Sequence, residues 1–125
     1  MSEKKPVGSV VWLDLTVENA DPLKDFYAAV LGMTTEGVDM GGYEDHMLYG
    51  PNQETALGVC HARGSNAKIP PVWMPMIVVE DLDKSLETCI ALGGKHLSEI
   101  SSYGEGRFTH ISDPQGTTLA LWQYD

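Results

Sequence analysis

The chain has 125 residues, of which 42% are hydrophobic and 21% charged, and its formal net charge is −10 at pH 7. This length and composition suit one globular domain and exclude disordered and fibrous proteins. The acidic balance also argues against nucleic acid and anionic membranes as partners, because binding to those surfaces relies on Lys and Arg.

Signals for targeting and for disulfide formation are sparse. No apolar run reaches the roughly 20 residues that span a bilayer. The first nine residues, MSEKKPVGS, lack the apolar core of a signal peptide. A cytoplasmic protein is therefore expected, in which the two cysteines, Cys60 and Cys89, are free thiols.

The first predicted elements are a strand and a helix. Residues Val10–Val17 are rich in β-branched and bulky side chains at both odd and even positions, which indicates a strand covered on both faces. Asn19 or Asp21 can then cap a helix, which is predicted over Pro22–Leu31 and ends at Gly32. Its apolar face, spaced as i, i+3, i+4 and i+7, consists of Leu23, Phe26, Tyr27 and Val30.

Three shorter strands follow, separated by turn residues. They are predicted over Thr34–Val38, His46–Tyr49 and Thr55–His61. The polar, proline-containing stretch Arg63–Pro71 then indicates a linker. The second half repeats this order, with a strand over Trp73–Val79, a helix over Leu82–Leu92, and strands over His96–Ile100, Arg107–Ser112 and Thr117–Gln123.

An internal repeat relates the two halves. Sliding the sequence by 62 residues places Val17-Glu18-Asn19 on Val79-Glu80-Asp81 and Thr55-Ala56-Leu57-Gly58 on Thr117-Thr118-Leu119-Ala120. A period of this length indicates a duplicated module rather than a solenoid. The chain is predicted to be a single domain, residues 1–125, with βαβββ modules at about 8–62 and 72–125 joined by linker 63–71.

Several motifs carry a family resemblance. They are Phe26-Tyr27 before Val30-Leu31-Gly32, Val79-Glu80-Asp81-Leu82, and Asp113-Pro114-Gln115-Gly116 before Leu119-Ala120-Leu121-Trp122. Over Val10–Gln123 the chain resembles the vicinal oxygen chelate superfamily, which includes glyoxalase I, bleomycin-resistance proteins, fosfomycin-resistance thiol transferases and extradiol dioxygenases. The resemblance implies an α+β fold of two tandem βαβββ modules whose curled mixed sheets form a cup, with the helices outside.

The resemblance also implies where a metal would be held in the enzymes of the superfamily. The four ligand positions, one on the first and one on the last strand of each module, correspond to Trp12, Gly58, Met74 and Ala120. None of these side chains is a usable ligand for the metals concerned. A shift of one residue in either direction gives no better donors, namely Val11 or Leu13, Leu57 or Val59, Trp73 or Pro75, and Leu119 or Leu121. Neither a metal nor another cofactor is therefore expected.

Strand alternation predicts which residues line the cup, because residues two apart share a face. The predicted lining is Trp12, Asp14, Thr16, Ala56, Gly58, Cys60, Met74, Met76, Val78, Thr118, Ala120 and Trp122. Leu48 and His110, interpreted as repeat mates, join it together with Phe108 and, less directly, His46. Small residues beside aromatic rings and methionines favour a flat, apolar ligand.

Few polar groups lie in the predicted lining, and each has a structural alternative. Asp14 is either a ligand-binding or basic carboxylate, or a group satisfied by its neighbours or at a solvated rim. His110 is either a general acid or base, or a satisfied core histidine. Cys60 fits a small buried hydrophobe better than a nucleophile, and Trp12 and Trp122 either stack on a ligand or fill the core.

Three classes of function remain open. The first is a metal-independent protein, similar to the bleomycin-resistance proteins, that binds an apolar or aromatic small molecule. The second is a metal-independent isomerase, lyase or hydrolase that uses Asp14 and His110, and the third is a metal-dependent lyase or dioxygenase. The resemblance and the exposed strand edges favour a homodimer, whose modules pair either within one chain or across two.

Overall fold

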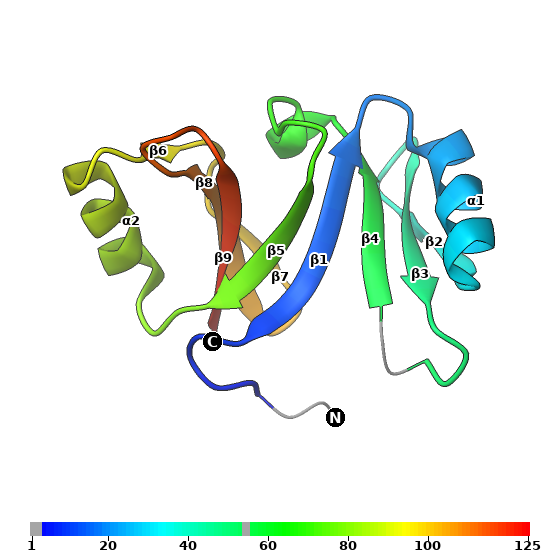
Figure 1. Ribbon diagram of the computed structural model, residues 1–125, viewed down its shortest axis with the longest axis horizontal. Coiled ribbons are helices and arrows are strands. Elements are labelled where there is room, and N and C mark those ends of the chain that lie inside the picture. Colours follow the sequence, from blue (N-terminus) through cyan, green and yellow to red (C-terminus); the bar gives the residue numbers. More distant parts are fainter. Residues whose placement is uncertain (1–3, 54–55) are drawn as a thin grey trace. The chain divides into compact units, whose positions relative to one another are not determined.

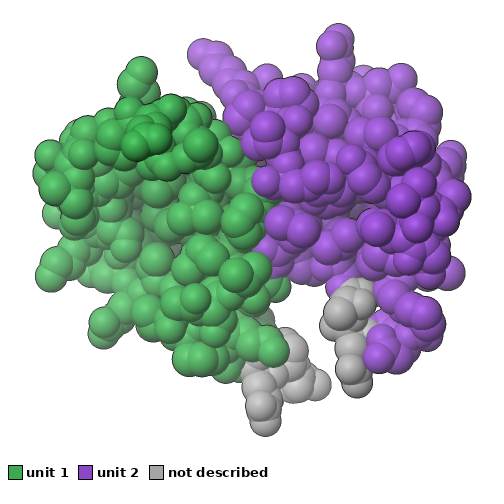
Figure 2. Space-filling model, viewed as in Figure 1, with its two compact units in different colours: residues 1–11, 74–125 green, residues 12–73 purple. Residues whose placement is uncertain are grey.

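The computed structural model describes residues 4–53 and 56–125. They form two units. Figure 1 colours the chain by position in the sequence, and Figure 2 gives each unit its own colour. Unit 2 is Trp12–Trp73, and unit 1 is Met74–Asp125 together with the N-terminal segment up to Val11. Within the described residues, no helix is long and apolar enough to cross a membrane.

Unit 2 contains the first βαβββ module. Its elements are β1 (Val10–Val17), α1 (Ala20–Leu31), β2 (Thr34–Asp39), β3 (Glu44–Tyr49) and β4 (Ala56–His61), and a short 3-10 turn follows at Gly64–Asn66. The strands are ordered β2-β3-β4-β1, and only the β1–β4 pair is parallel. These elements confirm the predicted order; Thr55, the predicted start of the last strand, lies outside the described residues.

Unit 1 repeats the topology with one added strand. Its elements are β5 (Trp73–Val78), α2 (Leu82–Ala91), β6 (Lys95–His96), β7 (Ser101–Tyr103), β8 (Gly106–Ser112) and β9 (Thr118–Tyr124). Strand β9 pairs in parallel with β5 and antiparallel with β8, and both β6 and β7 pair with β8. Gly8 and Ser9 form backbone hydrogen bonds to Val78 in the same unit.

The predicted strand over His96–Ile100 is wrong. Two short strands, β6 and β7, lie on either side of residues 97–100. At Ser98 side-chain hydrogen bonds replace part of the ladder, because its hydroxyl accepts from the backbone N–H of His110 at 3.2 Å and its carbonyl accepts from the Thr109 hydroxyl at 2.8 Å. Such local side-chain bonding competes with regular pairing.

Helix α1 buries a narrower stripe than its sequence pattern predicts. Leu23 and Tyr27 pack against a core formed by Ala20, Leu48 and Val59. Phe26 and Val30 were expected on the same face, but they are 56% and 63% exposed. The helix begins at Ala20 rather than Pro22, so the buried stripe follows residues 20, 23 and 27.

The helix ends follow ordinary capping chemistry. Asp81 caps α2, and its carboxylate accepts a hydrogen bond from the Lys84 backbone N–H at 3.1 Å. Gly32 ends α1 in the left-handed conformation, with φ of 67°. Asn19 stands at the N-cap of α1 without a side-chain cap.

The two modules differ by one residue in the register of their central hairpins. In unit 2, Leu48 pairs with Leu57, and in unit 1, Ile111 pairs with Leu119, which is 62 residues after Leu57. In the structure Leu48 therefore corresponds to Ile111, and Met47 corresponds to His110. The residue numbers in each of these pairs differ by 63 instead of 62. The predicted pairing of Leu48 with His110 as repeat mates is wrong, and a slip of one residue moves a side chain to the opposite face of a sheet.

Candidate functional site

Each sheet has one face packed against its helix and one face opposite, called here the helix-free face. In unit 2 the core beneath α1 contains Leu48, Leu57 and Val59. Residues that alternate with these along the strands point to the other side and form the helix-free face. The directly paired residues Asp14 and Gly58, and Thr16 and Cys60, therefore share that face. This face consists of Trp12, Asp14, Thr16, Asp45, Met47, Tyr49, Ala56, Gly58 and Cys60.

Asp14 is the central polar group of this face. Its carboxylate accepts a hydrogen bond of 2.5 Å from the indole Nε1–H of Trp12. Burial raises the pKa of Asp14 to about 6, the Trp12 hydrogen bond opposes this change, and the nearby Asp45 carboxylate adds to it. A carboxylate with a pKa near neutrality can take up or release a proton at physiological pH.

Cys60 lies beside these acids. Burial raises the pKa of its thiol far above the ordinary value, and Asp14 and Asp45 raise it further. The thiolate is the nucleophilic form, so this environment keeps the side chain unreactive. The arrangement agrees with the interpretation of Cys60 as a small hydrophobic group.

The four positions that the family resemblance assigns to metal ligands carry no donor set. Trp12, Gly58, Met74 and Ala120 carry no side-chain atom suited to a hard or borderline divalent ion. At Gly58 the space is also filled, because an added Cβ would overlap the Oδ1 atom of Asp14 and lie 3.2 Å from Nε1 of Trp12. Within residues 4–53 and 56–125, no group of three or more His, Cys, Asp or Glu side chains is arranged to hold a metal.

The helix-free face of unit 1 is more apolar. Helix α2 lies on the side of Gln123, whose side chain accepts a hydrogen bond from the Leu82 backbone N–H at 2.7 Å. The opposite parity forms the helix-free face, which consists of Met74, Met76, Val78, Gly106, Phe108, His110, Ser112, Thr118, Ala120, Trp122 and Tyr124. Met74, Met76 and Ala120 are buried on it.

His110 is a buried histidine within a chain of hydrogen bonds. Its Nδ1 atom lies 2.7 Å from the Ser98 hydroxyl, and its ring meets Phe108 edge-on at 5.7 Å between centroids. Burial lowers the pKa of His110 to about 4, and the nearby His96 contributes to the same effect. The ring is therefore neutral at physiological pH.

Trp122 presents a second buried nitrogen on this face. Its indole packs over Gly106, where an added Cβ would lie 2.5 Å from the ring, and meets Tyr124 edge-on at 5.6 Å. Among the residues that the structure describes, its Nε1–H has no hydrogen-bond acceptor. A buried N–H without an acceptor is unusual and carries a free-energy cost.

Two residues that the sequence placed in the lining lie elsewhere. Leu48 is fully buried beneath α1, which corrects its assignment as a ligand-binding residue. His46 shares that side, where its Nε2 atom lies 2.8 Å from the Asp21 carboxylate. Conversely, Asp45 and Met47 were missed; aligning β3 with β4 instead of with the repeat would have placed both on the helix-free face.

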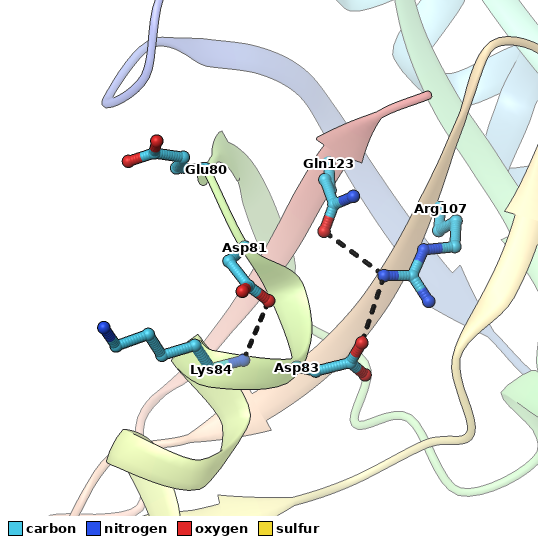
Figure 3. A pocket seen from close by; sticks show the side chains of 6 residues that line it. All are labelled: Glu80, Asp81, Asp83, Lys84, Arg107 and Gln123. Carbon is cyan, nitrogen blue, oxygen red and sulfur yellow. Dashed lines mark hydrogen bonds and ion pairs between the residues drawn. The ribbon is translucent and has the colours of Figure 1, made fainter.

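A shallow hollow lies at the N-terminus of α2, on the other side of the unit 1 sheet. It is lined by Glu80, Asp81, Asp83, Lys84, Arg107 and Gln123 (Figure 3). Arg107 is already bonded there, to Gln123 at 3.2 Å and to Asp83 at 3.4 Å. The hollow contains no predicted site residue, and it agrees with a structural role for acidic residues at this helix end.

Comparisons with known proteins are consistent with this fold. A family model described as Glyoxalase/Bleomycin resistance protein/Dioxygenase superfamily matches residues 9–121. The protein CFP32 of Mycobacterium tuberculosis, whose name marks it as a glyoxylase candidate, is 25% identical over 127 residues, which covers 93% of this chain and 46% of CFP32. The anthracycline biosynthesis protein DnrV of Streptomyces peucetius is 27% identical over 114 residues, covering 91% of this chain and 41% of DnrV.

The chain thus spans about half the length of the curated relatives that it matches. Among solved structures, a glyoxalase/bleomycin resistance protein/dioxygenase superfamily member from Vibrio splendidus aligns with a TM-score of 0.58. The alignment covers 90% of this chain and 96% of that one at 14% identity. This similarity establishes the same α+β fold.

Proposed function

From the premise that the chain belongs to the glyoxalase/bleomycin resistance protein/dioxygenase superfamily, we propose that it binds an apolar or aromatic small molecule, without a metal ion, on helix-free sheet surface. The observation that carries this proposal is the composition of the unit 1 face. Phe108 supplies partly exposed aromatic surface there above the buried Met74 and Met76, while His110 and Trp122 supply a few directed polar atoms.

Metal independence is supported by the chemistry of the four family ligand positions. Their side chains offer no suitable donor, and the Asp14 carboxylate occupies the space beside Gly58 into which a ligand side chain would project. Binding therefore relies on apolar contact and hydrogen bonds. This part of the proposal predicts that a chelator leaves ligand affinity unchanged.

The proposed aromatic character of the ligand is supported by one relative in particular. DnrV is named for anthracycline biosynthesis, and anthracyclines are flat polycyclic quinones. Since the chain spans less than half of DnrV, the proposal concerns the kind of molecule bound and not the whole activity of that protein. A flat ring system also suits a surface with aromatic and methionine side chains.

Binding can be tested with 2-(hydroxymethyl)anthraquinone as the probe, by quenching of tryptophan fluorescence and by native mass spectrometry. We expect saturable binding of one probe that is unaffected by EDTA. Phe108→Ala should weaken it by roughly fivefold to tenfold, the loss of one aromatic contact. Phe26→Ala is the matched control, because Phe26 is the same residue type, is 56% exposed and lies on helix α1 rather than on a helix-free face.

No saturable binding, or binding that EDTA abolishes and a divalent metal restores, would overturn the proposal. The same mass spectra report the oligomeric state. A homodimer remains a prediction from the sequence, and a monomer at micromolar concentration would contradict it.

Asp14 favours a second candidate function, a metal-independent isomerase, lyase or hydrolase. Its pKa of about 6 and its short hydrogen bond to Trp12 are features of a general base. In that case the reaction rate would rise with pH through a pKa near 6. Asp14→Asn would abolish turnover of any substrate while leaving probe affinity within about twofold, whereas a lack of turnover in the wild type would favour binding alone.

A further inference from the structure

We infer that Ser98 holds His110 as the neutral Nε2–H tautomer, so that His110 and Trp122 form a pair of N–H donors that selects a ligand by a carbonyl oxygen. The inference rests on the proposed function for the existence of a small-molecule ligand. It goes further by assigning His110 the role of a hydrogen-bond donor, and Ser98 the role of a positioning residue.

The direction of the hydrogen bonds follows from the Thr109 hydroxyl. Thr109 donates its proton to the backbone carbonyl of Ser98, which can only accept, at 2.8 Å. The Ser98 hydroxyl lies 2.7 Å from Nδ1 of His110 and 3.4 Å from Oγ1 of Thr109. The shorter contact has the ordinary length of a hydrogen bond and the longer one does not, so Ser98 donates to Nδ1.

Two further contacts agree with this direction. The Ser98 hydroxyl accepts from the backbone N–H of His110 at 3.2 Å, which leaves its own proton free to be donated to the ring. Nε2 of His96 lies 2.7 Å from Oγ1 of Thr109. Because the Thr109 proton is already committed, His96 donates to Thr109, and this chain of bonds ends at the Ser98 carbonyl. The bond from the Ser98 hydroxyl to Nδ1 of His110 is separate from it.

The neutral ring of His110 then carries its single proton on Nε2. His110 is only 4% exposed, and within the described part of the chain no hydrogen bond is formed by its Nε2 atom. The indole N–H of Trp122 is buried without an acceptor among the described residues, whereas Nε2 of His110 is not one of the fully buried atoms that lack a partner. Two unpartnered donors therefore belong to the same unit.

The strand register places both donors on one face. His110 pairs with Ala120, and Phe108 pairs with Trp122, so the histidine and the indole are diagonal neighbours on β8 and β9. Diagonal neighbours lie roughly 7–8 Å apart, within the span of one small ligand. No carboxylate belongs to this face among the described residues of β5, β8 and β9.

The chemical complement of two neutral donors is an acceptor oxygen without a competing charge. An anionic ligand is disfavoured by the net charge of −10, and neither donor offers a positive charge in return. The adjoining Met74, Met76 and Phe108 require an apolar body. These features together specify an aromatic ketone or quinone.

The tautomer can be measured without any ligand. Long-range ¹H–¹⁵N correlation spectra of the ¹⁵N-labelled full chain at pH 7 should show His110 with a protonated Nε2 and an unprotonated Nδ1. Ser98→Ala should mix the two tautomers, while Ser98→Thr, which keeps the hydroxyl, should preserve the wild-type pattern. A His110 ring protonated on Nδ1 in the wild type would overturn the assignment to Ser98.

The ligand class is tested with a matched pair of probes, 2-(hydroxymethyl)anthraquinone and 2-(hydroxymethyl)anthracene, which differ in the two carbonyl groups. We expect the quinone to bind the wild type at least about tenfold more tightly. Trp122→Phe and Ser98→Ala should each reduce that preference toward unity while changing affinity for the anthracene by less than about twofold.

The possible outcomes separate this inference from the proposed function. Equal affinity for the two probes would overturn the carbonyl inference and leave small-molecule binding in place. Binding of neither probe would overturn both the proposed function and the ligand class. A quinone preference that survives in Trp122→Phe and in Ser98→Ala would show that other groups supply the donors.

Discussion

The helix-free faces of the two units share a topology and differ in hydrogen-bonding character. The unit 2 face presents the carboxyl groups of Asp14 and Asp45 beside the protonated thiol of Cys60, whereas the unit 1 face presents neutral N–H donors, His110 and Trp122. When the two modules are compared by their strand pairing, each of these polar groups corresponds to an apolar or aromatic residue of the other module. The aligned pairs are Asp14 with Met76, Cys60 with Trp122, Asp45 with Phe108, and Met47 with His110.

This difference shows that two modules of similar topology carry different chemistry on corresponding faces. It also gives two titratable groups, the partly exposed Asp14 and the buried His110, opposite effects on stability. Folding favours the protonated form of Asp14 and the neutral form of His110. Their contributions change in opposite directions over nearly the same range of pH, so each becomes visible when the other is removed.

The largest expected effect concerns the two faces of β3. Leu48→Ala should reduce the free energy of unfolding by roughly 3–5 kcal/mol, because Leu48 is fully buried in the core beneath α1. Met47→Ala, its neighbour on the helix-free face, should cost about 1 kcal/mol because Met47 is partly exposed. Urea denaturation measures both values, and similar losses in the two variants would contradict the register.

His110→Asn should remove one component of acid sensitivity. The pKa of His110 falls from 6.5 to about 4 on folding, so its contribution to stability is complete above pH 6.5 and is lost as the pH falls toward 4. Without the titrating ring, the free energy of unfolding should fall less between pH 7 and pH 4, by on the order of 3 kcal/mol. Urea titrations between pH 4 and 7 test the prediction, which fails if the variant and the wild type keep parallel profiles.

Asp14→Asn should have the opposite effect. The pKa of Asp14 rises from 3.8 to about 6 on folding, so the fold is destabilised as the pH rises from about 4 to 6 and remains so above it. The variant should therefore be more stable than the wild type at pH 7.5, by roughly 2 kcal/mol after discounting for partial exposure. Thermal denaturation at pH 7.5 and pH 4 provides the measurement, and a less stable variant at pH 7.5 would contradict it.

The smallest effect concerns the reactivity of Cys60. Its raised pKa leaves almost no thiolate at pH 8, so alkylation by iodoacetamide should be roughly 100-fold slower in the folded chain than in urea. Asp14→Asn should accelerate the reaction several-fold, because Asp14 is one of the groups that raise this pKa. Peptide mass spectrometry follows the modification, and equal rates in the folded and unfolded chain would be inconsistent with the environment described.

Much of the fold was predictable because its signals are local. Apolar runs such as Val10–Val17 and the turn residues around them placed most strands to within one or two residues. Helix α1 was assigned correctly, but Phe26 and Val30 were predicted to be buried, since apolar periodicity alone does not show how wide a stripe the sheet covers.

The site was predicted less completely because it depends on register and on nonlocal contacts. Asp14 stood out as a carboxylate on an apolar strand, and the structure places it beside Trp12. The change of offset from 62 to 63 in the hairpins has no marker in the sequence, so Leu48 was assigned to the wrong face. The contact between Ser98 and His110 joins residues of separate segments, and neither residue identifies the other in advance.

The close approach of Asp14 to Gly58 has a consequence for how this sequence can evolve. A substitution that places any side chain at position 58 meets the Asp14 carboxylate, so its effect on fitness depends on which residue already occupies position 14. A side chain at position 58 requires the Asp14 side chain to move away or to be replaced. The residues that can be accepted at position 58 therefore depend on the residue at position 14, and the reverse holds as well.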